Sequence, residues 1–177
     1  MDTARTSGSP RVIAATIAAS AIMAALATSA AVPAQAAEKP AKPVVLTVMG
    51  GNAIVGITDT GEKGPTPGDM RTLSLTLSTT KSVPLGHVDV VQILTRQQGN
   101  IGTAVKTVEM TLPKGTISIM GVVEFADITN PGSRPNDGTE HLAIVGGTGA
   151  YRGTTGEVDI TTLPEFTSRW TLTIYRN

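Results

Sequence analysis

The sequence predicts an all-β protein, an eight-stranded antiparallel β-barrel preceded by an N-terminal signal segment. Beyond residue 42, short runs rich in Val, Ile, Leu and Thr recur at intervals of about ten residues, which is typical of sandwiches and barrels. Turn residues separate the runs, and the chain contains 19 Gly and 11 Pro. No helical period follows the first 36 residues. Eight antiparallel strands close into a barrel whose interior holds side chains or one small ligand, and closure removes exposed strand edges.

The N-terminus has the three parts of a secretory signal. Arg5 and Arg11 precede an apolar run at 12–32, and a small-residue cleavage site follows at 34–36. The alternative is a membrane anchor, since about 20 apolar residues suffice to cross a bilayer. The run is rich in Ala and ends in Ala-x-Ala, which favours a cleaved signal. We therefore expect a signal peptide at 1–36, a short leader at 37–42, a barrel domain at 43–177, secretion, and no membrane contact after cleavage.

The first four strands are predicted from alternation and from the turns between them. The clearest is 71–78, in which leucines alternate with Thr and Ser. Ala104, Val108 and Met110 alternate in the same way with polar residues in the fourth strand. Residues 50–69 carry six Gly and two Pro and are expected to be mostly loop. The predicted ranges are 44–49, 71–78, 87–96 and 103–112.

The last four strands follow a tight turn at 113–115. A second long loop is expected at 128–139, and Pro164 marks the last corner. The predicted ranges are 116–126, 140–145, 154–163 and 165–177.

A glycine-rich segment joins the sixth and seventh strands, and it has two possible explanations. A dinucleotide-binding loop needs the pattern G-x-G-x-x-G before a helix. Here Arg152 stands where the third glycine belongs, and the next residues alternate as a strand. The segment is therefore predicted to be a structural barrel corner, because glycines permit positive φ angles. Its residues are Gly146, Gly147, Thr148, Gly149 and Gly153.

Composition excludes several classes of function. The chain has no Cys, so thiol chemistry and thiolate metal sites are absent. The formal net charge is zero and aromatics make up 3%, so no nucleic-acid partner is expected. The two His lack supporting ligands at suitable spacing, and we expect neither a metal nor a cofactor.

The segment 142–160, LAIVGGTGAYRGTTGEVDI, resembles the corner shared by plant allene oxide cyclases and dirigent proteins. The likeness continues to RWTLTIY at 169–175 and suggests a secreted bacterial-type member. The resemblance implies an eight-stranded barrel, usually trimeric, that steers a cofactor-free ring closure or isomerisation of an apolar substrate. Because fold alone does not carry function, a lipocalin-like carrier and a structural barrel with a filled lumen stay open.

The resemblance also directs attention to polar groups in the lumen. The cyclases have an acid and an Asn on the first strand and a lumen cysteine. Here the first strand has no acid, Asn52 is its plausible polar residue, and Gln92 stands roughly where the cysteine would align. Asp89 lies in an apolar strand and is either a lumen acid or base, or an outward, solvated residue.

Aromatic residues and arginines complete the candidates. Trp170, the only tryptophan, shares a predicted strand face with Phe166, and this face lines the lumen or packs between subunits. Tyr151 is expected to anchor the corner and is a further candidate for ligand binding. Arg71, like the arginines at 152 and 169, is either a surface charge or a partner for a substrate carboxylate at the barrel mouth.

Overall fold

The structure, a computed structural model, describes residues 42–129, 138–165 and 167–176. The predicted signal peptide, most of the leader and Phe166 lie outside the described residues. The chain divides into a unit Met1–Glu38, which is not described, and a unit Lys39–Asn177 that contains the barrel. Among the described residues, no helix has the length and apolar character needed to cross a membrane.

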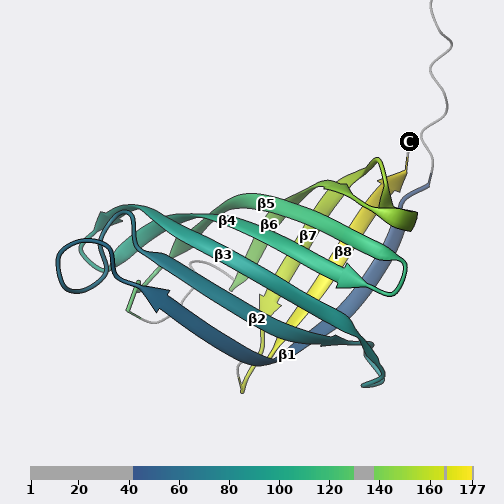
Figure 1. Ribbon diagram of the computed structural model, residues 1–177, viewed down its shortest axis with the longest axis horizontal. Helices are drawn as coiled ribbons and strands as arrows, with labels where there is room; N and C mark the ends of the chain where they lie inside the picture. The colour runs from purple at the N-terminus through teal and green to yellow at the C-terminus, as the bar shows by residue number, and fades with distance from the viewer. Residues whose placement is uncertain (1–41, 130–137, 166, 177) are drawn as a thin grey trace, which may run out of the picture. The chain divides into compact units, whose positions relative to one another are not determined.

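Eight strands form one closed antiparallel barrel in chain order, which confirms the predicted fold class (Figure 1). Strand β1 pairs with β8 along Val44–Gly50, and this pairing closes the barrel. The strands are β1 (Val44–Thr58), β2 (Met70–Ser78), β3 (Pro84–Gln98), β4 (Ile101–Leu112), β5 (Gly115–Phe125), β6 (Thr139–Gly147), β7 (Thr154–Thr162) and β8 (Ser168–Arg176).

The first strand is much longer than predicted. Residues 50–58 continue β1, so the expectation of a mostly looped 50–69 is wrong for this part. The chain forms a bulge between Gly51 and Ile54 rather than a reversal, with Asn52 at a φ of 51°, and pairing with β2 then resumes at Ile54. Gly50 fits here because a Cβ would lie 2.6 Å from Ser168 Oγ. The true loop spans 59–69.

The last strand starts later than predicted. Leu163 N donates to Thr167 O, and Glu165 has a φ of 60°, so the chain turns after Leu163. Strand β8 therefore begins at Ser168 and not at 165.

The glycine-rich segment turns the chain between β6 and β7 through a single 3-10 turn, η1 (Gly149–Tyr151). Gly149 and Gly153 have φ angles of 57° and 71°, which favour glycine. The corner is tied to the neighbouring turn: Thr148 N donates to Thr116 O, and Thr116 N donates to Thr148 Oγ1.

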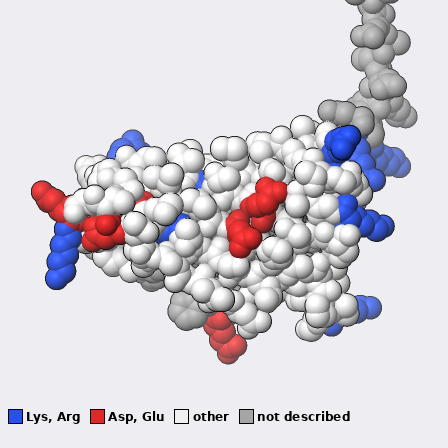
Figure 2. Space-filling model, in the orientation of Figure 1, with Lys and Arg blue, Asp and Glu red and all other residues white. Residues whose placement is uncertain are grey.

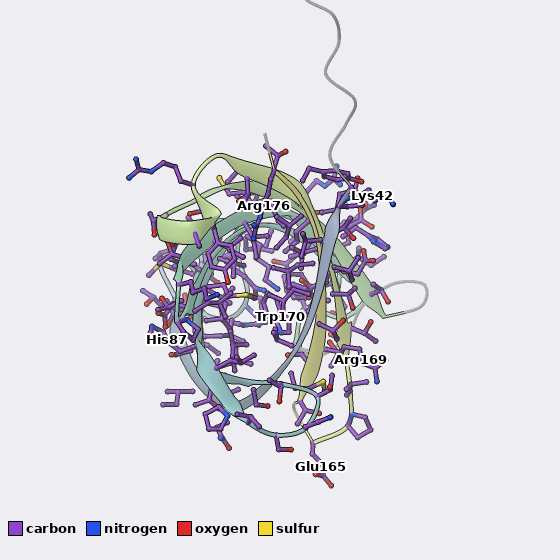
Figure 3. All side chains as sticks on the ribbon, turned by 90° about the vertical axis from the view of Figure 1, so that its right-hand side faces the viewer. Lys42, His87, Glu165, Arg169, Trp170 and Arg176 are labelled. Atoms are coloured by element: carbon purple, nitrogen blue, oxygen red, sulfur yellow. The ribbon has the colours of Figure 1, made fainter. Side chains whose placement is uncertain are left out.

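Alternate residues of every strand point into the barrel and form its core. Trp170 is 2% exposed and lies inside the ring of strands, whereas His87 and Arg169 lie outside it (Figure 3). The interior toward the corner is filled by apolar side chains with no exposure. They are Val48, Val88, Val108, Met110, Ile117, Ile119, Val158 and Leu172. The space that remains lies at the opposite end, where β1, β3 and β5 finish.

Candidate functional site: a cavity at one end of the barrel

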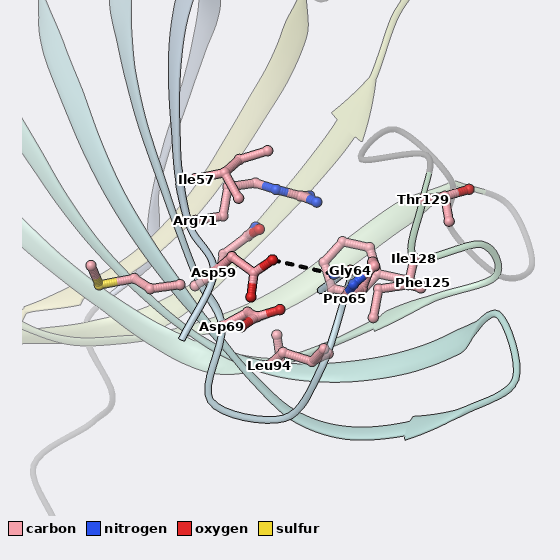
Figure 4. Close-up of a pocket in the computed structure, with 13 residues that line it drawn as sticks. Ile57, Asp59, Gly64, Pro65, Asp69, Arg71, Leu94, Phe125, Ile128 and Thr129 are labelled. Carbon is pink, nitrogen blue, oxygen red and sulfur yellow. Dashed lines mark hydrogen bonds between the residues drawn. The ribbon is translucent and has the colours of Figure 1, made fainter. Parts of the chain in front are cut away.

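A cavity of about 350 Å³ opens at the end of the barrel where β2 and β4 begin (Figure 4). Such a volume lies within the usual range for small-molecule sites, about 300–1,000 Å³. The lining is mainly apolar and comes from β1 to β5 and the loops beside them. It consists of Ile57, Asp59, Gly64, Pro65, Asp69, Met70, Arg71, Gln92, Leu94, Ala104, Phe125, Ile128 and Thr129.

The loop 59–69 forms one wall of the cavity and is held by two carboxylates. Asp69 accepts hydrogen bonds from Thr60 N at 2.9 Å and Thr66 N at 2.7 Å. These backbone donors, Thr60 first, lower the pKa of Asp69 because they favour its charged form. Asp59 accepts a hydrogen bond from Gly64 N at 3.2 Å. The carboxylates at the rim thus fix the wall.

Two polar side chains enter the apolar lining next to each other. Arg71 on β2 faces Gln92 on β3 in register, and both line the cavity. Gln92 is only 4% exposed. The guanidinium of Arg71 lies over the ring of Phe125, 5.6 Å from its centroid, which is cation-π geometry. The cavity therefore combines an apolar body with a cationic and an amide donor.

A buried ion pair continues this polar row away from the cavity. Gln92 pairs in register with Lys106 on β4. Lys106 Nζ donates to Glu140 Oε2 on β6 at 2.6 Å, and both side chains are almost fully buried. Lys106 Nζ also lies 5.6 Å from the ring centroid of Trp170, whose Nε1 donates to Ser168 Oγ at 2.8 Å. The interior thus contains opposite charges within an otherwise apolar core.

Of the candidate catalytic residues, the structure places only Gln92 in this cavity. Asp89 lies on the outer face, where its carboxylate is 3.5 Å from His87 Nε2 and its side chain is 58% exposed. This removes Asp89 from the lumen, in line with the outward alternative. Asn52 sits at the β1 bulge, where its amide donates to Thr76 Oγ1 at 3.1 Å. It lines a second hollow of about 530 Å³ outside the first cavity, rich in small and hydroxyl-bearing residues.

The two described aromatic candidates, Trp170 and Tyr151, pack in or against the core. Trp170 belongs to the buried core. Of the two positions considered for its strand face, the barrel interior is therefore the one that the structure has. Tyr151 packs against the core from the corner. Neither is among the residues that line the cavity, whereas Phe125, which the sequence did not single out, is.

Lys106 and Glu140 were missed by sequence reasoning, although a signal exists. Lys106 has the same parity as the inward Ala104 and Val108 on its strand. Glu140 likewise shares its parity with the inward Leu142 and Ile144. A charged residue in phase with a buried face is expected to be buried and paired.

Within the described ranges, no three His, Cys, Asp or Glu side chains gather to hold a metal ion. The expectation of no metal and no cofactor stays a prediction.

Comparisons with known proteins agree with this architecture. Among solved structures, a pyocyanin demethylase is similar with a TM-score of 0.61 and 21% identity, over 74% of this chain and 99% of that one. A nonspecific heme-binding cyclase that catalyses a cycloaddition during neoabyssomicin biosynthesis has a TM-score of 0.58 and 15% identity, over 78% and 66%. A Diels-Alderase from Streptomyces koyangensis gives 0.57 and 14%, over 80% and 71%. At these identities the likeness shows the fold alone.

No curated protein matched the sequence. Residues 52–174, more than half of the chain, match the family described as the allene oxide cyclase barrel like domain. The chain belongs to the allene oxide cyclase barrel like family.

Proposed function

We propose that this protein binds a small, mainly apolar organic molecule in the end cavity and steers its cofactor-free cyclisation or isomerisation. The observation that carries the proposal is the cavity itself, which is mainly apolar, with Asp59, Asp69 and Thr129 in its lining and with Arg71 and Gln92 side by side on β2 and β3. An apolar pocket with a few convergent polar groups is the usual form of a binding or active site. The filled interior toward the corner limits the guest to this end.

The proposed chemistry depends on the shape of the cavity and on the fixed hydrogen-bond donors in its wall. A closed apolar wall selects one folded conformation of a flexible guest, which lowers the entropic cost of ring closure. Arg71 and Gln92 are the candidate donors to an oxygen that gains negative charge during the reaction. The cyclase and the Diels-Alderase among the similar folds support this reaction class.

The test must separate a catalyst from a carrier. The protein is incubated with a small-molecule extract of its source, and bound compounds are identified by mass spectrometry. Turnover by cyclisation or isomerisation yields a product with unchanged mass and altered retention time. A lipocalin-like carrier returns the same compound unchanged, and a structural barrel retains nothing.

A matched pair of variants assigns the binding to the cavity. Ala104 lines the cavity and is buried, whereas Ala143 on β6 is exposed on the outer face. Ala104→Phe fills the cavity and is expected to abolish retention of the compound. Ala143→Phe adds the same ring outside and leaves retention intact. Equal retention by both variants would rule out this cavity as the site.

The proposal includes export. The protein recovered outside expressing cells is expected to begin at Ala37, since cleavage is predicted after Ala36. N-terminal sequencing checks this, and an intact N-terminus in the membrane fraction would favour the anchor.

A further inference from the structure

We infer that the guest of the end cavity carries a lactam-type amide, whose C=O and N–H form a pair of hydrogen bonds with the side-chain amide of Gln92. This inference rests on the proposed function, because it specifies which class of molecule the same cavity takes. It goes further by naming the functional group of the guest and the side chain that recognises it.

Gln92 is a buried polar residue at the wall of the cavity. It lies on the inward face of β3, between the inward Val90 and Leu94, and is only 4% exposed. Within the described part of the chain, no residue is hydrogen-bonded to its side-chain amide. Gln92 lines the cavity, so a molecule bound there can reach this amide. Because buried polar groups are nearly always hydrogen-bonded, we expect a ligand to supply the missing partners.

The side chain of Gln92 offers two different hydrogen bonds at once. Its carbonyl oxygen accepts, and its NH2 group donates. A carboxylate on the guest can only accept and an ammonium can only donate, so either group leaves half of the Gln92 amide unpaired. A neutral cis amide presents an acceptor and a donor on one edge and matches both halves. Lactams, cyclic imides and primary carboxamides have such an edge.

The rest of the lining suits the apolar part of such a guest. Leu94, Phe125 and Ile128 border the same cavity (Figure 4). A hydrogen bond in these apolar surroundings is stronger than the same bond in water. A guest that fills the cavity but lacks the donor or the acceptor leaves a buried polar group unpaired, which weakens its binding. Gln92 is therefore a residue that determines specificity.

Two probes that share one bicyclic shape test the inference. The lactam 2-quinolinone has a ring N–H beside its C=O, and coumarin has a ring oxygen in place of that N–H. NMR titration of the isotope-labelled protein measures both affinities, and Ala104→Phe identifies the signals that report on the cavity. We expect 2-quinolinone to bind about tenfold more tightly or better, because coumarin leaves the carbonyl oxygen of Gln92 unpaired. The side-chain NH2 signals of Gln92 are expected to shift in the same titration.

A variant of Gln92 shows whether this residue distinguishes the two probes. Gln92→Leu has a similar size and no polar side-chain atom, and it is expected to remove the preference while coumarin still binds. Gln98→Leu makes the same change at an exposed position of the same strand. This matched control is expected to keep the preference.

Thermal unfolding gives a second measurement that does not depend on a ligand. Since no described residue bonds the amide, Gln92→Leu is expected to unfold at the same temperature as Gln98→Leu or at a higher one. A clearly lower unfolding temperature would show that the fold itself uses the Gln92 amide, and this would overturn the inference.

The outcomes separate the inference from the proposal beneath it. If neither probe gives a signal that Ala104→Phe removes, the cavity does not bind these small molecules and the proposed function fails. If both probes bind there equally, or the preference survives Gln92→Leu, the cavity is a binding site but the amide-bearing guest is wrong.

Discussion

The least expected residues are the two that form an ion pair inside the barrel. Burying two charges costs several kcal/mol per ion, and a good hydrogen bond returns only part of that cost. Lys106 and Glu140 are both more than nine-tenths buried, so their pair is poorly explained as a source of stability. Lys106 pairs in register with Gln92 on β3, and Glu140 contacts Lys106 from β6. Buried charged groups concentrate at functional sites. The position of this ion pair next to Gln92 is consistent with an effect on the electrostatic potential in the cavity.

Removing one member of the pair leaves the other buried without that partner. Lys106→Met is expected to lower the free energy of unfolding by about 3–5 kcal/mol, while Lys106→Met combined with Glu140→Leu loses much less. Urea unfolding followed by the fluorescence of Trp170 measures both, since it is the only tryptophan. Lys114→Met, in an exposed turn, is the control. A double variant as unstable as the single one would show that the pair itself stabilises the barrel.

At the level of the strands, the alternation of apolar and polar residues predicted most of the architecture. It failed where a bulge in the backbone interrupts the alternation. The alternation in β2 and β4 correctly predicted which residues of these strands point into the barrel, because one face of each strand is buried. Residues 50–58 were misjudged, since local composition does not reveal that the strand continues through a bulge between Gly51 and Ile54 and stays paired with β2. The cavity could not be derived from the sequence, because it depends on which end the core fills. The burial of Lys106 and Glu140 could have been predicted, because each lies an even number of positions from the inward residues of its strand.

The corner between β6 and β7 depends on glycine for two different reasons, which substitution separates. Gly149 and Gly153 both have positive φ, so Ala at either costs about 1–2 kcal/mol. A Cβ at Gly149 would also collide with the carbonyl oxygen of Lys114, whereas the space around Gly153 is open. Gly149→Ala is therefore expected to destabilise the protein clearly more than Gly153→Ala in urea unfolding. Equal losses would mean that φ alone determines the corner.

The loop 59–69, which forms one wall of the cavity, is held at both Thr60 and Thr66 by the ionised side chain of Asp69. The pKa of Asp69 is lowered by Thr60 and Thr66, so its contribution is complete above the ordinary value of 3.8. That contribution is lost as the pH falls through the lowered pKa of the folded state. The amide proton signals of Thr60 and Thr66 in NMR are expected to shift together with a midpoint below 3.8. Asp69→Asn removes this transition, and a midpoint at or above the ordinary value would contradict the role of the backbone donors.

For the whole molecule, the outer surface of the closed barrel is a face available for association. Figure 2 shows a largely uncharged surface over the strands that face the viewer, with acidic side chains near its centre and others at its left end and lower edge. Three apolar residues form a continuous row across this sheet, since Val105 pairs in register with Ile93 on β3 and Val122 on β5. They are 39%, 44% and 60% exposed. Exposed apolar residues that adjoin on one surface are typical of contact sites.

We propose that this outer row of β3, β4 and β5 packs against other copies of the chain, in the homotrimer that the family resemblance implies. Val105→Arg places a charge at the centre of the row and is expected to shift the protein toward the monomer, because a buried unpaired charge is costly. Val83→Arg, in the exposed turn between β2 and β3, introduces the same charge away from the row and leaves assembly unchanged. Light scattering coupled to size-exclusion chromatography gives the mass of each form. A trimer that survives Val105→Arg would place the interface on another face, and a monomeric parent protein would show that the row serves a different partner or none.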